Sequence, residues 1–447
     1  MLNKKLDEYL SNNYYPFHMP GHKRQNLFNS SLPYGRDLTE IRGFDNLNDP
    51  EDIFVDIENK ISEIYEVEDS IISVNGSTAA ILSAIRSLTY NNKNILIQRS
   101  SHKSVYNAIE LNKLSPNYLS VVLDNHDMIV DVDMANLSYE LNNNNYAAVV
   151  LTSPSYEGYR LDLKSIYSLC KKNNTPLILD MAHGSHELLD GSYDSKVFDI
   201  AITSFHKNLS ALTPSAAMLI NNKSYTKELR RNMAIFQSSS PSYIILQSID
   251  EMINHFNQFY KLRQKLNDSL DKIYNLNLDN LSIIDSKYKD RTKIVISTNK
   301  TNISGQELSD LLYEEKIEVE LSNPTYVLLI ASIFDTSEGF KRLEKSLVKI
   351  DKNLMSKDVK TKFSYLIPKK EMEIWQASIS KKKTLDLDKS VGYISGQFVY
   401  AYPPGIPILA PGELIDEQIL ENIDKLTSPS TSLNIDNSIS VIDWQKS

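Results

Sequence analysis

The feature that most constrains this chain is a regular alternation of short apolar runs and amphipathic helical patterns from about residue 52 to residue 220. Short apolar runs between helices are typical of parallel strands that helices cover on both faces. The expected strands are residues 70–74, 94–98, 118–123, 147–151, 176–180, 198–203 and 215–220, and the expected helices are residues 53–65, 76–88, 104–112 and 162–172. The alternation therefore predicts an α/β fold with a mostly parallel sheet.

The length of 447 residues is sufficient for two or three domains with a large core. We expect an irregular N-terminal segment, a large domain, a small α/β domain and a C-terminal domain, in residues 1–50, 51–285, 286–352 and 353–447. A long helix over about residues 243–273 is expected to link the large domain to the small one.

Composition excludes several classes of protein. The formal net charge of −9 argues against a nucleic-acid surface. The chain contains no apolar run of the roughly 18 residues that a membrane span needs, and its start has no apolar core of signal-peptide length. Cys170 is the single cysteine, so neither a disulfide framework nor a thiolate metal cluster is expected. These observations predict a soluble cytoplasmic protein without a metal site.

Residues that could take part in catalysis or ligand binding follow several of the expected strands. Lys207 comes just after the apolar run 198–202, where a lysine is costly to desolvate unless it is paired or its pKa is lowered. One established use of such a lysine is a Schiff base with an aldehyde cofactor. Parallel sheets bind ligands at the carboxyl ends of their strands. Gly76, His102, Asp180 and Lys207 are therefore expected to lie at one edge of the sheet.

Nine short motifs are spread over about residues 15–415: Phe17–Lys23, Phe44–Pro50, Gly76–Thr78, Ser101–Val105, Ser155–Tyr159, Asp180–His186, Ser204–Lys207, Ser238–Tyr243 and Tyr402–Glu413. In this order they resemble the ornithine/lysine/arginine decarboxylase family of fold-type I pyridoxal phosphate (PLP) enzymes. The resemblance implies an aspartate aminotransferase-like large domain followed by a small domain and a C-terminal domain. The flavodoxin-like N-terminal domain of longer members is missing, so the chain is similar to the short form, and a homodimer or small homo-oligomer is expected.

For the cofactor ring, the resemblance implies roles for four residues. Lys207 would hold PLP as a Schiff base and later move protons at the α-carbon of the substrate. Asp180 would face the ring nitrogen and keep it protonated. His102 would stack on the ring, and His183 would lie beside it. The alternative for Asp180 is a hydrogen-bonded strand-end aspartate, and a lone histidine after a strand, as His102 is, would more often be structural.

The residues that the resemblance assigns to the cofactor phosphate are Gly76, Ser77, Thr78, Ser204, His206 and Ser238. The first three open an expected helix, where backbone N–H groups favour an anion, although an ordinary helix cap would use the same residues. Ser204 and His206 would approach from the other side. Ser238 would come from the neighbouring subunit, which implies shared active sites; a simple serine-rich turn is the alternative.

The reaction of a PLP enzyme depends on which bond of the substrate α-carbon is made labile. Aminotransferases usually hold the substrate carboxylate in the plane of the ring with a C-terminal arginine. The chain has no arginine after Arg342, which favours a decarboxylase. A PLP-dependent aminotransferase and a non-catalytic PLP-binding regulator remain alternatives. Met181 and Pro214 depart from the family pattern beside the expected site.

The resemblance implies a basic L-amino acid as the substrate, with arginine first, then lysine and ornithine. The distal cationic group of such a substrate needs a carboxylate at the mouth of the site. Glu413 and Asp45 are the candidates, and Glu413 is equally understood as a carboxylate at the start of a helix.

Overall fold

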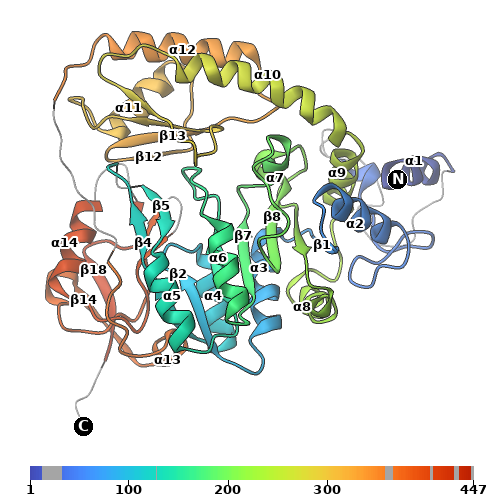
Figure 1. The fold of residues 1–447 in the computed structure, drawn as a ribbon, viewed down its shortest axis with the longest axis horizontal. Helices are drawn as coiled ribbons and strands as arrows, with labels where there is room; N and C mark the ends of the chain where they lie inside the picture. Colours follow the sequence, from blue (N-terminus) through green and yellow to red (C-terminus); the bar gives the residue numbers. More distant parts are fainter. Residues whose placement is uncertain (13–32, 127, 358–365, 403–405, 427–431, 444–447) are drawn as a thin grey trace. The chain divides into compact units, whose positions relative to one another are not determined.

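The computed structural model describes residues 1–12, 33–126, 128–357, 366–402, 406–426 and 432–443. Figure 1 shows the helices and strands coloured along the sequence. The chain divides into two compact units, residues 1–88 with 177–264 and residues 89–176 with 265–447, which are called here the first and the second unit. The motif Phe17–Lys23 lies outside the described residues, as do residues 403–405 of the Pro-rich motif.

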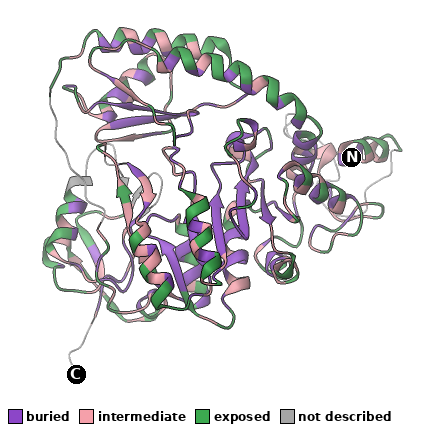
Figure 2. Cartoon of the chain, viewed as in Figure 1, coloured by how far each residue is buried: buried purple, intermediate pink, exposed green. Residues whose placement is uncertain are grey.

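The first unit contains four strands of the central sheet. In spatial order they are β1 (Asp69–Ser73), β9 (Ala216–Ile220), β8 (Ile200–Ser204) and β7 (Leu177–Met181). β7 and β8 run parallel, whereas β9 is antiparallel to both β8 and β1. Every residue of β7, β8 and β9 is buried, which explains their largely apolar sequences (Figure 2).

The α-helices of the first unit are α1 (Leu2–Ser11), α2 (Ile53–Ile64), α3 (Gly76–Leu88), α7 (Phe205–Asn208), α8 (Thr226–Phe236) and α9 (Tyr243–Asn254). Its short 3-10 helices are η1 (Tyr34–Arg36), η2 (Glu187–Leu189) and η3 (Lys223–Tyr225). α3 packs against α8 and against β8 and β9. Helix α10 (Phe256–Tyr274) begins in the first unit and ends in the second.

The second unit contains three parallel strands of the central sheet, β6 (Val149–Thr152), β2 (Asn94–Gln98) and β3 (Ser115–Leu119), in that order. Helices α4 (Lys103–Asn112), α5 (Met134–Asn143) and α6 (Leu163–Lys172) accompany them, together with the hairpin β4 (Val121–Leu123) and β5 (Ile129–Val132). Figure 2 shows that α5 and α6 each keep an exposed side. This amphipathic pattern is the one expected for helices that cover a sheet.

The remainder of the second unit has a small antiparallel sheet and a C-terminal segment. The sheet has the order β10 (Ser282–Ile284), β11 (Lys293–Ser297), β13 (Tyr326–Ile330) and β12 (Leu321–Asn323), with α11 (Gly305–Glu314) and α12 (Ser337–Asp351). The C-terminal segment contains α13 (Ile374–Ile379), β14 (Lys382–Asp386), η4 (Leu387–Lys389), β15 (Val399–Tyr402), β16 (Ile406–Leu409), α14 (Glu417–Leu426), β17 (Ser432–Leu433) and β18 (Ser438–Ile442). Val399, Leu409, Ile419 and Val441 belong to its apolar core.

The predicted fold class, with a mostly parallel central sheet, is confirmed, but three local predictions are wrong. Residues 1–50 are not wholly irregular, because α1 forms and buries Leu2 and Leu6 completely. The expected helix 243–273 is interrupted at His255, which ends α9. The expected strand 118–123 is two strands, and β4 leaves the central sheet to pair with β5. The expected domain boundaries stay predictions.

Hydrogen bonds across the first unit explain why α1 could not be inferred from its own sequence. The N-terminal amine of Met1 lies 3.2 Å from both carboxylate oxygens of Asp250, and the Asn3 N–H donates to the same carboxylate at 3.1 Å. α1 packs against α9. A helix of ten residues depends on such tertiary contacts. In the described ranges of the chain, no helix is both long and apolar enough to cross a membrane.

Candidate active site

Strand register in the first unit brings several predicted residues to one edge. Ser73 of β1 and Ser204 of β8 both pair with Ala216, the first residue of β9. The carboxyl ends of β1 and β8 therefore flank the beginning of β9. Gly76 follows the first of these ends and Lys207 follows the second, so the structure gathers them as the sequence predicted.

Lys207 and His183 are in direct contact at this edge. Lys207 is half-buried in the single-turn helix α7, and its Nζ lies 2.9 Å from Nε2 of the buried His183. His183 follows β7, which runs parallel to β8 and pairs Met181 with Thr203. An amine and an imidazole at hydrogen-bond distance can share a proton, so this pair can hold or move one at the Lys207 amine.

Asp180 offers a buried carboxylate at the carboxyl end of β7. It pairs with Ile202 of β8, and its side chain is almost fully enclosed. Oδ1 accepts the backbone N–H of Ala182 at 3.1 Å. Among the described residues no donor reaches Oδ2. A buried carboxylate is stabilised by a cationic or N–H partner, so Asp180 fits a protonated ring nitrogen.

The start of α3 has the features of a phosphate site. Gly76 is the first residue of this 13-residue helix and has a φ of +73°, a conformation that side chains with a Cβ rarely adopt. A Cβ there would also lie 3.4 Å from Pro214 Cβ. Ser77 is half-buried and Thr78 is exposed. The helix start can therefore present its N–H groups to an anion at close range.

Ser204 provides an independent observation that fits a bound anion. Ser204 is completely buried, and within the described part of the chain its Oγ has no hydrogen-bond partner. A buried hydroxyl left unpaired costs about 1–3 kcal/mol. Because Ser204 lies across β9 from the strand that leads to Gly76, a phosphate oxygen would satisfy it. The residues present thus fit a bound phosphate group.

His206 holds the turn after β8. Its Nδ1 is 2.9 Å from the Ser215 carbonyl, to which it donates. Burial lowers the pKa of His206 below its ordinary value; the Ser215 carbonyl opposes this, and the charge of Lys207 lowers the pKa further. In the neutral ring, the single N–H of His206 is at Nδ1 and donates to the Ser215 carbonyl. Nε2 could donate to a phosphate only if the ring were protonated. The phosphate contact of His206 stays a prediction.

Ser238 is exposed and lies beside the start of α3 in its own chain. Its backbone N–H donates to Asn75 Oδ1 at 3.2 Å, and Gln237 Oε1 accepts the Val74 N–H at 2.9 Å. The hydroxyl of Ser238 donates to the Ser240 carbonyl at 3.2 Å. Its predicted role as a phosphate contact from a neighbouring subunit is not tested by this geometry and stays a prediction.

His102 lies in the second unit, at the carboxyl end of β2, and is the N-cap residue of α4. Its Nδ1 accepts the Ser104 N–H at 3.2 Å and lies 2.8 Å from Ser104 Oγ. These two contacts fix the orientation of the ring. A held, half-buried imidazole after a strand is suited to stacking, which stays its predicted role.

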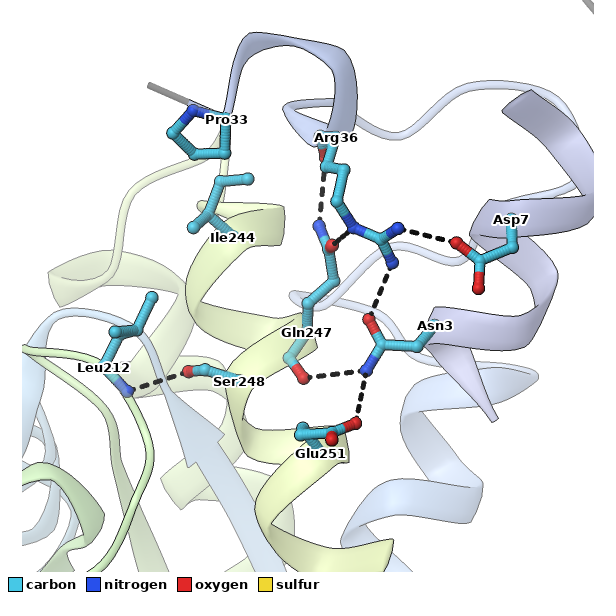
Figure 3. A pocket seen from close by; sticks show the side chains of 9 residues that line it. All are labelled: Asn3, Asp7, Pro33, Arg36, Leu212, Ile244, Gln247, Ser248 and Glu251. Carbon is cyan, nitrogen blue, oxygen red and sulfur yellow. Dashed lines mark hydrogen bonds and ion pairs between the residues drawn. The ribbon is translucent and has the colours of Figure 1, made fainter. Parts of the chain in front are cut away.

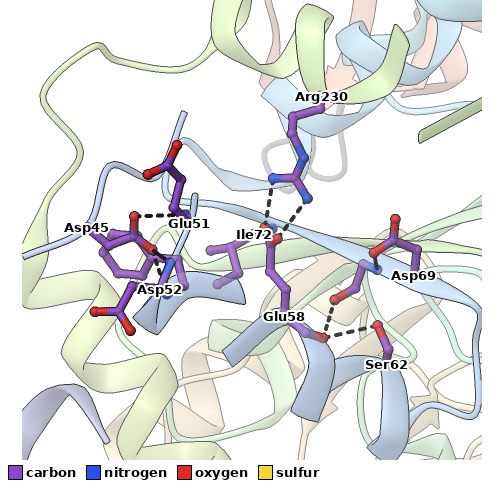
Figure 4. A network of polar contacts seen from close by, with 10 residues as sticks. Asp45, Glu51, Asp52, Glu58, Ser62, Asp69, Ile72 and Arg230 are labelled. Carbon is purple, nitrogen blue, oxygen red and sulfur yellow. Dashed lines mark hydrogen bonds and ion pairs between the residues drawn. The ribbon is translucent and has the colours of Figure 1, made fainter. Parts of the chain in front are cut away.

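Asp45 does not provide a free carboxylate for a substrate. Its two oxygens accept the backbone N–H groups of Asn46 and, around the start of α2, of Glu51, Asp52 and Phe54, all at 2.9–3.0 Å. Figure 4 shows Asp45 beside Glu51 and Asp52. Burial alone would raise the pKa of Asp45, but the four donors hold it below its ordinary value. The neighbouring pair Glu58–Arg230, at 2.8 Å, ties α2 to α8. Asp45 is therefore structural.

Glu413 is likewise not a substrate carboxylate at a site mouth, nor does it start a helix. It is 1% exposed, forms two hydrogen bonds with Arg99, and precedes α14 by several residues. Sequence analysis did not single out Arg99. The available signal was a charged residue directly after a buried strand, three positions before His102.

An open pocket of about 410 Å³ in the first unit lies elsewhere (Figure 3). On its wall Arg36 bonds Asp7 at 2.6 Å, Gln247 at 2.7 Å and Asn3 at 3.0 Å. Its polar groups thus satisfy one another, and none of the predicted cofactor residues lines it. This pocket is not a candidate for the cofactor site.

The carboxyl edge of the first unit thus provides an amine, a carboxylate and an anion cradle, the combination that a fold-type I PLP enzyme requires. Comparisons with known proteins agree. The chain matches the family model of the Orn/Lys/Arg decarboxylase major domain over residues 1–281 and that of the C-terminal domain over residues 357–431. This chain belongs to the Orn/Lys/Arg decarboxylase family.

Individual relatives extend the similarity over most of the chain. An arginine decarboxylase of Bacillus subtilis is 28% identical over 444 residues, which cover 91% of this chain and 90% of that protein. An arginine decarboxylase of Halalkalibacterium halodurans is 27% identical over 440 residues, covering 91% and 89%.

Solved structures show the same fold. A lysine decarboxylase of Francisella novicida has a TM-score of 0.83 at 18% identity, covering 99% of this chain and 81% of that one. The constitutive lysine decarboxylase of E. coli has a TM-score of 0.82 at 16% identity, covering 99% and 82%. The predicted fold-type I class is confirmed. The protein is a PLP-dependent decarboxylase, and family membership disfavours the aminotransferase and regulator alternatives.

Proposed function

We propose that the protein decarboxylates L-arginine to agmatine and carbon dioxide. The observation that carries this proposal is the similarity to arginine decarboxylases over about nine-tenths of both chains. Lysine and ornithine are the second and third choices. The absence of arginine from the sequence after Arg342 supports decarboxylation over transamination, because the usual in-plane carboxylate clamp is missing from that part of the chain.

The residues of this chain would divide the work as follows. Lys207 would hold the cofactor covalently and would later move a proton at the substrate α-carbon, and His183 lies 2.9 Å from its Nζ to share that proton. Asp180 would keep a proton on the ring nitrogen. Gly76 and Ser204 would hold the phosphate. PLP, when bound, draws electrons from the α-carbon and so makes its bonds labile.

Incubation with PLP and one amino acid at a time tests the substrate. Purified protein with arginine is expected to release one carbon dioxide for each agmatine, identified by mass spectrometry, and to turn over lysine and ornithine more slowly. A faster reaction with lysine or ornithine would overturn arginine as the substrate. Stoichiometric conversion of PLP to pyridoxamine phosphate, reversed by a keto acid, would favour an aminotransferase instead.

We further propose a cytoplasmic homodimer with shared active sites. Cys170 is the single cysteine of the sequence and is buried, and a chain without a disulfide framework is typical of a reducing compartment. The exposure of Ser238 beside the start of α3 leaves it accessible to a second copy. Lys207 and Ser238 would then belong to different chains at each site.

Mixing two defective chains is expected to restore activity. One chain has Lys207→Ala, and the other has Ser238, Ser239 and Ser240 replaced by alanine. If the serines serve the partner's site, about half of the dimers are mixed and each has one intact site, so about a quarter of normal activity is expected. The measurement is the turnover of the mixture, which should exceed the summed turnover of the two variants assayed separately. No gain on mixing would mean that Ser238 serves its own chain, beside Asn75.

A further inference from the structure

We infer that Arg99 and Glu413 form a positioning pair that sets the His102 ring from the C-terminal segment of the chain. The inference rests on the proposed stacking role of His102. It assigns to the C-terminal segment a part in holding the cofactor, although the Glu413 side chain is itself enclosed.

The pair is a bidentate ion pair. Arg99 Nη1 lies 2.6 Å from Glu413 Oε1, and Nη2 lies 2.9 Å from Oε2. Nη2 also donates to the Ile408 carbonyl at 3.0 Å, and Oε2 accepts the Ala410 N–H at 2.7 Å. The two side chains are 0% and 1% exposed. The guanidinium carbon lies 4.8 Å from the centre of the Tyr118 ring, a cation–π contact.

Because the pair is enclosed, its two charges stay paired and its geometry is fixed. Burial would lower the pKa of Arg99, but the carboxylate of Glu413 raises it above its ordinary value, so the guanidinium stays charged. A charge in this setting requires its partner, because removing one side leaves the other uncompensated. The planar fork of arginine also fixes the angle at which the two groups meet. Movement at Glu413 is therefore transmitted to Arg99.

The backbone of Arg99 leads directly to His102. The Arg99 N–H donates to the Leu119 carbonyl of β3 at 3.1 Å, and the Arg99 carbonyl accepts the Tyr106 hydroxyl at 2.6 Å. The Ser101 N–H donates to the Gln98 carbonyl at 3.0 Å, which closes the turn. His102 follows as the N-cap residue of α4. The C-terminal segment thus holds, through Arg99, the turn of residues 98–101 that directly precedes His102.

A second polar anchor of the same segment provides a matched control. Lys370 Nζ lies 3.1 Å from Glu373 Oε1 and donates to the Pro116 carbonyl at 3.0 Å. Ser115 Oγ donates to the same carboxylate at 2.6 Å. Ser115 and Pro116 begin β3, whereas Arg99 follows the end of the parallel strand β2. The two anchors therefore lie at opposite ends of the strands, and only one is next to His102.

The test compares Glu413→Gln with Glu373→Gln in the full-length protein reconstituted with PLP. Circular dichroism of the bound cofactor, per mole bound, reports the tilt of the ring, and unfolding of the apoprotein reports stability. Glu413→Gln is expected to change the dichroism and to weaken PLP binding roughly tenfold, the size of a contact coupled within one network. Glu373→Gln is expected to lower stability and leave the dichroism unchanged.

A double-mutant cycle shows whether the effect passes through His102. In a His102→Ala background, Glu413→Gln is expected to change the dichroism little further. An equal change in both backgrounds, or a Glu413→Gln variant with altered stability and normal dichroism, would overturn the inference. If Glu413→Gln does not fold, Arg99→Lys keeps the charge without the fork and is expected to give the same optical change. Failure of the unmodified protein to bind PLP would instead overturn the proposed function.

Discussion

Replacing Lys207 with alanine is expected to abolish covalent attachment of PLP and to lower turnover at least about 10³-fold. The Lys207 amine is proposed both to hold the cofactor and to move a proton at the α-carbon, and a positioned acid–base group alone contributes roughly 10²–10⁴-fold. Borohydride reduction of the loaded wild type followed by peptide mass spectrometry should locate the pyridoxyl group on Lys207. Carbon dioxide release measures the turnover of each variant.

The exposed Lys196 provides the control for this experiment. Lys196→Ala removes a lysine near the site in sequence but is expected to leave attachment and turnover unchanged. A pyridoxyl group found on any other lysine, or normal turnover in Lys207→Ala, would refute the assignment of Lys207. Because Lys207 contacts His183, His183→Ala should reduce turnover while the cofactor stays attached to Lys207.

Replacing Asp180 with asparagine is expected to leave PLP bound but to lower turnover by about 10²–10⁴-fold. Asparagine keeps the shape of the side chain and the bond from the Ala182 N–H, but it cannot hold a proton on the ring nitrogen. Breaking a buried ion pair costs about 3–5 kcal/mol, and each 1.36 kcal/mol on the barrier is about tenfold in rate. Cofactor absorbance and steady-state turnover on the same sample separate binding from chemistry.

Asp199 is the matched control for Asp180. It is also buried and accepts the Leu177 N–H at 2.9 Å, but it precedes β8 and so lies at the opposite end of the strands from Asp180. Asp199→Asn should reduce the free energy of unfolding and leave turnover per folded molecule near normal. Equal turnover losses in both variants would mean that Asp180 acts through stability and that the ring nitrogen lies elsewhere.

The sequence predicts the central sheet because its strands have a local apolar pattern. It also predicts that Gly76, Asp180 and Lys207 lie at one edge, because each follows or ends a strand. Buried strands need apolar residues, and parallel strands end at a common edge. The direction of β9 was not predictable, since a strand buried on both faces has the same apolar pattern in either direction. The contact between Lys207 and His183 depends on loop conformations that follow the strands.

Long-range polar pairs were the least predictable part of the site. Glu413 was interpreted as a substrate carboxylate or a helix-start residue, yet its partner Arg99 is 314 positions away in the sequence. Asp45 was a substrate candidate, but backbone donors at the start of α2 occupy it. A carboxylate in a sequence does not show whether its hydrogen-bond capacity is already used. Only the fold decides between a ligand contact and a structural role.

The enclosed pair of Arg99 and Glu413 has a consequence for the order in which the protein is made. Synthesis proceeds at roughly 5–20 residues per second. β2 and Arg99 are therefore synthesised well before Glu413. Until then the guanidinium must stay in water, because burying it alone is strongly unfavourable. We therefore expect the carboxyl end of β2 to reach its final packing only after the C-terminal segment has been synthesised. A truncated chain that lacks this segment is expected to leave Arg99 exposed to water and the turn before His102 less ordered.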